Sequence, residues 1–293
     1  MRAISGYCVA AVSSIIVTAC SGSSSSSSGS SSSSSSGSSS SSSIGTTRPN
    51  GGVWIDSTFN GSTTPLGGSF ALVTETGEFF GVEFPDPPSS TIGTLDFTGD
   101  KITGTGEYVT YSPSACPTVL CPLGSQGTVL NGTINRKSTM ELSGTLSAPL
   151  GQPPPPPLNY SFSYSSSYEL GSSLATVAGT WVDNSAGSLV IDSSGNVTGQ
   201  VSSKGPSGSC TVHGLVTIVN PNYNVYDISL SFSGCTDTPF WQGRDGTGTG
   251  IFTVGTGSIQ GGTAPVPKIM GGAAINLSAG GQVMYSMFLF KGE

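Results

Sequence analysis

Charged side chains are scarce in this 293-residue sequence: 9% of the residues are Asp, Glu, Lys or Arg, and the formal net charge is −7. With nine basic residues and no basic patch, the chain lacks the electrostatic footprint of a nucleic-acid-binding protein. The same acidity disfavours electrostatic docking on an anionic membrane surface. Lys, Glu and Leu, which favour long helices, are few. The 43 glycines, with abundant Ser, Thr and Val, instead favour strands and turns.

Residue types that carry most enzyme chemistry are also nearly missing. His213 is the only histidine, which argues against a His-rich metal site, and there is no Gly-x-Ser-x-Gly elbow of the kind that serine hydrolases use. Glu75, Glu78 and Glu83 surround one predicted hairpin, where we expect a hydrated edge. We therefore predict no catalytic residue, no metal and no cofactor. A hydrolase that works with carboxylates alone is the less favoured alternative.

The apolar stretch Ala3–Ala19 is shorter than the roughly 20 residues that a membrane-spanning helix needs, and three serines interrupt it. One basic residue precedes it, a layout that predicts a secretory signal peptide over residues 1–19. Val17-Thr18-Ala19-Cys20 resembles the bacterial lipobox. The resemblance implies cleavage before Cys20, acylation of its thiol (palmitate) and new amino group, and, because Ser21 rather than aspartate follows, residence in the outer membrane. The alternative is a secreted protein with a stray cysteine.

Residues 21–43 are serine interrupted by three glycines. Such a tract cannot bury apolar surface, so we expect it to be disordered. As a flexible coil it would span about 25–30 Å. We interpret residues 20–50 as a lipidated cysteine plus a tether that holds the folded part off the membrane. The alternative is an expanded serine repeat whose length has no function.

Four cysteines remain once Cys8 leaves with the signal peptide and Cys20 is lipidated, and an even number outside the cytoplasm suggests two disulfides. Cys116–Cys121 can close a small loop. Cys210–Cys235 can bridge a hairpin with its turn at residues 221–224. Zinc is the disfavoured alternative, because these spacings are unusual for a zinc site.

The hairpin between Cys210 and Cys235 predicts a register as well as a disulfide. A turn centred between Asn222 and Tyr223 makes the two cysteines face each other directly across adjacent strands. The same register places His213 opposite Phe232. We interpret His213 as a structural residue rather than a catalytic base.

Two segments of about 115 residues begin and end alike, which indicates an internal duplication. Apolar–polar alternation between glycine and proline turns predicts eight strands in each segment. The first set is roughly 52–57, 69–75, 78–84, 92–97, 101–111, 127–134, 138–147 and 158–166; the second is roughly 179–184, 187–192, 196–203, 209–219, 225–234, 247–255, 268–277 and 283–290.

Sequential hairpins of this kind favour an all-β fold of two tandem eight-stranded antiparallel up-and-down barrels. The first barrel repeat would occupy residues 51–170 and the second residues 171–293. One helical turn is expected within 172–178, between the repeats. The alternative fold is a pair of β-sandwiches.

Each repeat starts with Gly-x-Trp on its first predicted strand, at Gly52 and Trp54 and again at Gly179 and Trp181. This placement in an eight-stranded meander resembles the lipocalin and calycin signature. The resemblance implies that each tryptophan closes the floor of its barrel under a basic residue from the last strand. Lys291 matches that residue in the second repeat, and the first repeat has none. The alternative is that both tryptophans are ordinary core residues.

Phe240 and Trp241 lie between Cys235 and Asp245, where they form either an exposed contact patch or a lid on the second barrel. Together these features predict a non-enzymatic, membrane-anchored envelope lipoprotein whose two barrels bind a small apolar ligand or an envelope protein. The alternative is a structural or surface-interaction lipoprotein with solid barrels, because side chains can fill an eight-stranded barrel.

Overall fold

The computed structural model describes residues 50–56, 68–84, 89–112, 121–135, 138–147, 155–183, 187–202, 209–235, 245–257, 266–277 and 282–292. Both repeats belong to one compact unit, Thr46–Glu293. The predicted signal peptide, Cys20 and the serine tract lie outside the described residues. The described part of the chain holds no helix with the length and apolar character of a membrane span.

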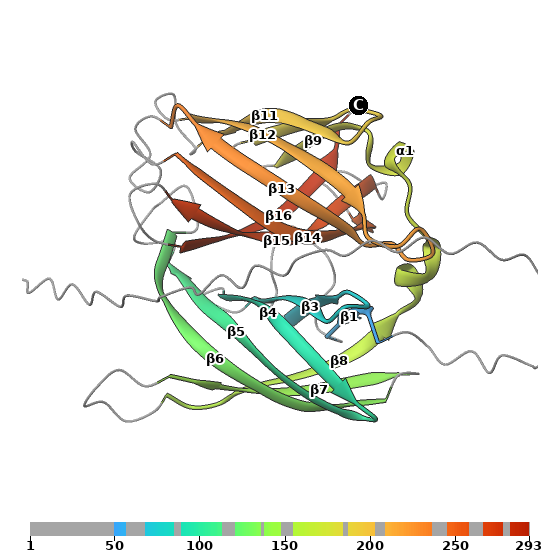
Figure 1. The fold of residues 1–293 in the computed structure, drawn as a ribbon, viewed down its shortest axis with the longest axis vertical. Helices are drawn as coiled ribbons and strands as arrows, with labels where there is room; N and C mark the ends of the chain where they lie inside the picture. Colours follow the sequence, from blue (N-terminus) through green and yellow to red (C-terminus); the bar gives the residue numbers. More distant parts are fainter. Residues whose placement is uncertain are drawn as a thin grey trace, which may run out of the picture. The chain divides into compact units, whose positions relative to one another are not determined.

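Sixteen strands run through the described residues in two groups of eight. The first group comprises β1 (Gly52–Ile55), β2 (Gly68–Val73), β3 (Glu78–Phe84), β4 (Ser89–Thr98), β5 (Lys101–Ser112), β6 (Cys121–Asn135), β7 (Thr139–Leu146) and β8 (Leu158–Ser165). The second comprises β9 (Gly179–Asp183), β10 (Gly187–Ile191), β11 (Asn196–Ser202), β12 (Ser209–Ile218), β13 (Tyr226–Ser233), β14 (Gly246–Gly257), β15 (Val266–Leu277) and β16 (Gln282–Lys291). The 3-10 helix η1 (Ser166–Leu170) and the one-turn helix α1 (Leu174–Val177) connect the groups (Figure 1).

Each group of strands closes into a barrel. Neighbouring strands are antiparallel, β1 pairs with both β2 and β8, and β9 pairs with both β10 and β16. Closure therefore gives every described strand two partners. The predicted fold of two tandem eight-stranded up-and-down barrels is confirmed, and the β-sandwich alternative is wrong. Below, barrel 1 means β1–β8 and barrel 2 means β9–β16.

The same glycine turn follows the second strand of each repeat. Gly77 and Gly195 have φ values of 88° and 87°, a conformation that glycine adopts without strain. The carbonyl of Gly77 accepts a 2.7 Å hydrogen bond from the Leu95 amide, and the carbonyl of Gly195 accepts a 2.8 Å bond from the Val216 amide. The two hairpins that the sequence aligns thus have the same geometry in both barrels.

The start of β6 differs from the prediction. The sequence placed Cys121 at the end of a loop and began the strand near Gly127, whereas β6 begins at Cys121. The extra residues pair with the end of β5, and the register shifts between Thr110 and Tyr111. Proline and glycine near the strand start hid this irregular extension. Cys116, the predicted partner of Cys121, lies outside the described residues.

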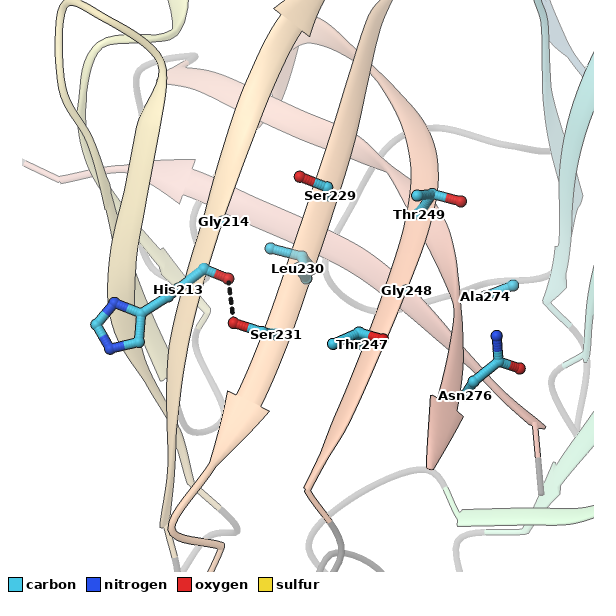
Figure 2. Close-up of a pocket in the computed structure, with 10 residues that line it drawn as sticks. All are labelled: His213, Gly214, Ser229, Leu230, Ser231, Thr247, Gly248, Thr249, Ala274 and Asn276. Carbon is cyan, nitrogen blue, oxygen red and sulfur yellow. Dashed lines mark hydrogen bonds between the residues drawn. The ribbon is translucent and has the colours of Figure 1, made fainter. Parts of the chain in front are cut away.

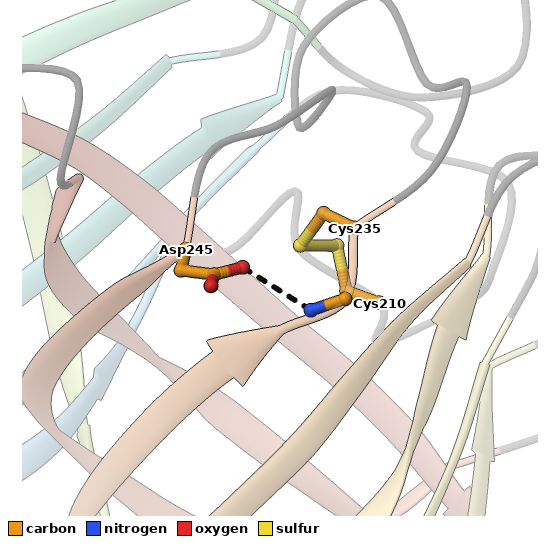
Figure 3. The surroundings of a disulfide bond; sticks show 4 residues. Cys210, Cys235 and Asp245 are labelled. Atoms are coloured by element: carbon orange, nitrogen blue, oxygen red, sulfur yellow. Dashed lines mark hydrogen bonds between the residues drawn. A yellow bond between two sulfur atoms is a disulfide. The ribbon is translucent and has the colours of Figure 1, made fainter.

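The Cys210–Cys235 disulfide is present, with Cα atoms 4.1 Å apart (Figure 3). Beside it, the Gly234 amide donates a 3.1 Å hydrogen bond to Asp245 Oδ1. The predicted register of this hairpin was wrong by one residue, since Ser231 rather than Phe232 pairs with His213. The β12–β13 pairing begins at Thr211 and Ser233, so both cysteines lie just outside the paired residues. The disulfide still forms there because Gly234 turns the chain with φ 61°.

Replacing both Cys210 and Cys235 with alanine should lower the free energy of unfolding by about 3 kcal/mol, because the bond closes a loop with a sequence separation of 25. Thermal unfolding of the full chain with and without reductant measures this effect. Reductant should lower the melting temperature of the wild type by more than that of the double variant, which keeps the predicted Cys116–Cys121 bond. Equal melting temperatures of the two oxidised proteins would contradict the prediction.

The outer face of β1–β3 packs against barrel 2. Phe70, Leu72 and Phe80 are fully buried in one apolar cluster with Ile251 and Met270. These strands of barrel 1 therefore bury both faces, one in the barrel interior and one against barrel 2. Their sequences are nearly continuous apolar runs for this reason.

The loop between β12 and β13 holds the segment that joins the barrels. Tyr168 of η1 is buried and stacks on Tyr223, with ring centroids 4.9 Å apart. The backbone amide of Asn224 donates a 2.7 Å bond to the Tyr168 carbonyl. Its side-chain Nδ2 donates to the carbonyls of Ser167 at 3.1 Å and Val254 at 2.6 Å. One buried amide thus ties the connection to the body of barrel 2.

Candidate functional site

Trp181, the predicted floor residue of barrel 2, is fully buried. Its indole Nε1 donates a 2.7 Å hydrogen bond to the Val177 carbonyl at the end of α1. Lys291 pairs with Trp181 across β9 and β16, and its Nζ lies 5.6 Å from the ring centroid. The predicted basic partner is therefore in contact with the tryptophan. Gly179 has a φ of 138°, a backbone conformation that residues with a side chain rarely adopt, which explains the glycine of this Gly-x-Trp pattern.

The tryptophan of barrel 1 occupies the corresponding place with a different partner. Trp54 is buried, and Tyr164 takes the position opposite it that Lys291 takes in barrel 2. The two rings meet edge to face, with centroids 5.2 Å apart. Trp54 Nε1 is buried and has no hydrogen-bond partner among the described residues. In the part of the chain that the structure describes, barrel 2 alone thus has the tryptophan–cation pair that the family resemblance implies.

The described interiors of the two barrels are lined by side chains of different chemistry. In barrel 2 the inward residues are apolar from Trp181 to the disulfide, and Val212, Leu230 and Phe232 are buried along the way. In barrel 1 the apolar core around Trp54 gives way to polar inward positions. We call these the polar end of barrel 1: Glu83, Ser89, Thr91, Tyr108, Gln126 and Tyr160.

Strand register explains why the polar end gathers residues from distant parts of the sequence. Gln126 pairs with Tyr108, Tyr108 pairs with Thr91, and Glu83 pairs with Ser89. Paired residues project from the same face of a sheet. Their side chains therefore share the face that carries the buried core of barrel 1.

Hydrogen bonds and burial define the electrostatics of the polar end. Ser89 Oγ donates a 3.2 Å bond to Glu83 Oε2. Burial raises the pKa of Glu83, the Ser89 bond opposes this change, and the negative charge of Asp56 adds to it. Burial likewise raises the pKa values of Tyr108 and Tyr160, so both phenols stay protonated at neutral pH. Gln126 Oε1 is buried and has no hydrogen-bond partner among the described residues.

This arrangement suits the recognition of a small polar molecule. Buried acceptors are normally paired, because an unpaired one costs about 1–3 kcal/mol. A ligand that donates a hydrogen bond to Gln126 Oε1 would remove that cost. The neutral phenols of Tyr108 and Tyr160 and the carboxyl of Glu83 offer further donors and acceptors, which together fix an orientation.

The three glutamates of the β2–β3 hairpin do not form one hydrated edge. Glu75 Oε1 accepts bonds from Tyr168 Oη at 2.9 Å and from the Gly51 amide at 3.2 Å. Glu78 lies on the outer face, and Glu83 lies inside barrel 1. The expectation of a simple solvated turn was wrong because two of these side chains are half-buried by elements distant in sequence.

His213 lies on the exposed outer face of barrel 2, not opposite a core phenylalanine. Figure 2 shows a shallow hollow of small polar side chains on β12–β15, with the imidazole pointing away from them. Ser231 Oγ donates a 3.3 Å bond to the His213 carbonyl rather than to its ring. The hollow therefore does not use the imidazole.

Of the residues selected from the sequence, Gly52, Trp54, Gly179, Trp181, Cys210 and Cys235 are described. Cys20, Cys116, Phe240 and Trp241 lie outside the described residues. Across the described ranges, no group of three or more His, Cys, Asp or Glu residues could hold a metal. Sequence reasoning missed Gln126, Tyr108 and Tyr160. They are separated by an even number of positions from core residues of the same strand, such as Leu130 and Phe162. This spacing could have predicted that their side chains face the barrel interior.

Comparisons with protein-family models, with curated proteins and with solved structures found no match.

Proposed function

We propose that the protein is a non-enzymatic, lipid-anchored envelope lipoprotein in which barrel 1 binds a small polar ligand at its polar end. The observation that carries this proposal is the buried Oε1 of Gln126, which has no hydrogen-bond partner in the described part of the chain and lies within a cluster of hydroxyl, carboxyl and amide groups. Ligand sites need a few convergent polar groups on a rigid frame, and a closed barrel supplies such a frame.

Barrel 2 has a different part in this proposal. Its apolar interior is occupied by its own side chains, including Trp181 and Phe232. This favours the solid-barrel alternative for the second repeat, which would act as a support or as a surface for an envelope partner. The lipobox at Cys20 and the serine tract supply the anchor and the reach in the same proposal.

Replacing Gln126 with methionine should remove ligand binding and keep the fold, because methionine has a similar length and Oε1 makes no hydrogen bond to any residue that the structure describes. Native mass spectrometry of the chain, purified from its own envelope without denaturation, should show a bound small molecule. Occupancy should fall about tenfold in Gln126→Met, as expected for one lost hydrogen bond in a buried site.

Gln200→Met is the matched control, since Gln200 is exposed on the strand β11 of barrel 2. It should leave occupancy unchanged. The proposal is wrong if the wild type carries no small molecule, or if Gln126→Met and wild type carry it equally.

A further inference from the structure

A groove with a volume of about 550 Å³ lies between the outer faces of the two barrels. Strands β3 and β4 supply one wall, through Glu78, Ile92 and Thr94. The other wall is a row of cross-strand neighbours on β12 to β15: Thr217, Asp227, Ile251 and Gly272. The groove lies outside both barrel interiors, so it is separate from the polar end of barrel 1.

The floor of the groove is apolar. Ile251 is buried in the cluster that joins the barrels, and Ile92 packs against the same cluster. Leu215 lines the groove and is 42% exposed, an unusually open position for a leucine in this chain. An occupant would therefore bury an apolar stem against these three side chains.

Two carboxylates from different barrels face this groove. Glu78 comes from barrel 1 and Asp227 from barrel 2. Burial raises the pKa of Glu78, and the negative charge of the nearby Asp227 adds to this rise. Burial raises the pKa of Asp227. Within the described ranges, no positive charge lowers either pKa. Asp227 Oδ1 is buried and has no hydrogen-bond partner among the described residues.

We propose that this groove binds a primary ammonium group carried on an unbranched apolar chain, with Asp227 and Glu78 holding the ammonium and Ile92, Ile251 and Leu215 holding the chain. The ammonium supplies three hydrogen-bond donors and the positive charge that the two acids lack. A calcium ion fits less well, because it takes about six to eight oxygen ligands and gains nothing from apolar walls.

The ammonium could belong to a free amine or to a lysine side chain of a polypeptide. Hexylammonium is a probe for the first source, and the peptide acetyl-Gly-Lys-Gly-amide is a probe for the second. Hexanol has the apolar stem without the charge. Titrations of the full chain, followed by calorimetry or NMR, should show hexylammonium binding about tenfold or more tightly than hexanol, because the bonds to the acids are charge-assisted.

Asp227→Asn is the decisive variant because it keeps the shape of the side chain and removes its charge. It should weaken hexylammonium binding about tenfold or more and leave hexanol binding unchanged. The variant should fold at least as well as the wild type. The raised pKa of Asp227 means that its charged form is disfavoured in the folded state, so ionisation above its usual pKa costs stability.

Asp96→Asn is the matched control, since Asp96 is exposed on β4 beyond Thr94 and does not line the groove. It changes the net charge equally and should leave binding unchanged. If the peptide binds and its binding depends on Asp227, a lysine side chain is a source of the ammonium. If the peptide does not bind, the site takes free amines only. The proposal is overturned if hexanol binds as tightly as hexylammonium, or if Asp96→Asn and Asp227→Asn have equal effects.

This test is independent of the proposed function. Gln126→Met should leave hexylammonium binding unchanged, because Gln126 faces the interior of barrel 1 and does not line the groove. Loss of the small polar ligand with amine binding intact, or the reverse, separates the two proposals.

Discussion

Replacing Asn224 with alanine should lower the free energy of unfolding by about 3–5 kcal/mol, since each buried group left unpaired costs about 1–3 kcal/mol. Asn224 is 2% exposed and its side chain makes three hydrogen bonds. Nδ2 donates to the carbonyls of Ser167 and Val254, and Oδ1 accepts from the Val254 amide at 3.3 Å. Alanine would leave all three backbone groups without this partner in a buried place.

The bonds of Asn224 also connect parts that are far apart in the sequence. Ser167 belongs to the segment between the barrels, and Val254 belongs to β14 of barrel 2. Thr253 Oγ1 donates a further 2.6 Å bond to the Asn224 carbonyl. The substitution should therefore loosen the joining segment as well as barrel 2. We expect amide hydrogen exchange to increase over residues 165–173 and over β14 together.

Urea unfolding followed by tryptophan fluorescence measures the loss of stability. Asn222→Ala is the matched control, because Asn222 lies in the same loop and is exposed. Its effect should stay within about 0.5 kcal/mol, as is usual for surface substitutions. Equal effects of the two variants would show that Asn224 acts only as a loop residue.

The architecture was predictable because its signals are local and repeated. Gly-x-Trp occurs at the start of both repeats, and the turns at Gly77 and Gly195 recur at corresponding places. Inward and outward side chains alternate along each strand, whichever strand it pairs with, so each strand can be recognised from its own sequence. The strand count, and hence barrel closure, could therefore be inferred without knowing any distance.

The sites were harder to predict because they depend on register and on contacts between repeats. An error of one residue in the β12–β13 hairpin moved Phe232 to the wrong face, since successive side chains of a strand alternate between faces. Asn224 has the sequence appearance of any turn asparagine. The approach of Glu78 to Asp227 arises only when the two barrels pack together, which no local pattern records.

Replacing Cys20 with serine should abolish acylation of the protein and release its folded part from the membrane. The prediction rests on the resemblance of Val17-Thr18-Ala19-Cys20 to the bacterial lipobox, which implies that the Cys20 thiol carries the first lipid, and serine lacks this thiol. Each buried methylene of an acyl chain contributes about 0.8 kcal/mol, and stable anchoring takes more than one chain. Incorporation of labelled palmitate should fall to background in this variant.

Cys8→Ser is the matched control for this experiment, since Cys8 lies in the apolar stretch that we predict to be a signal peptide. It should incorporate palmitate like the wild type and appear in the same membrane fraction. Persistent labelling of Cys20→Ser would exclude Cys20 as the lipid site. A wild-type protein that incorporates no palmitate would favour the secreted alternative, in which the serine tract is not attached to a membrane. The small-polar-ligand and ammonium tests would still apply to that secreted protein, because neither site involves the N-terminal segment.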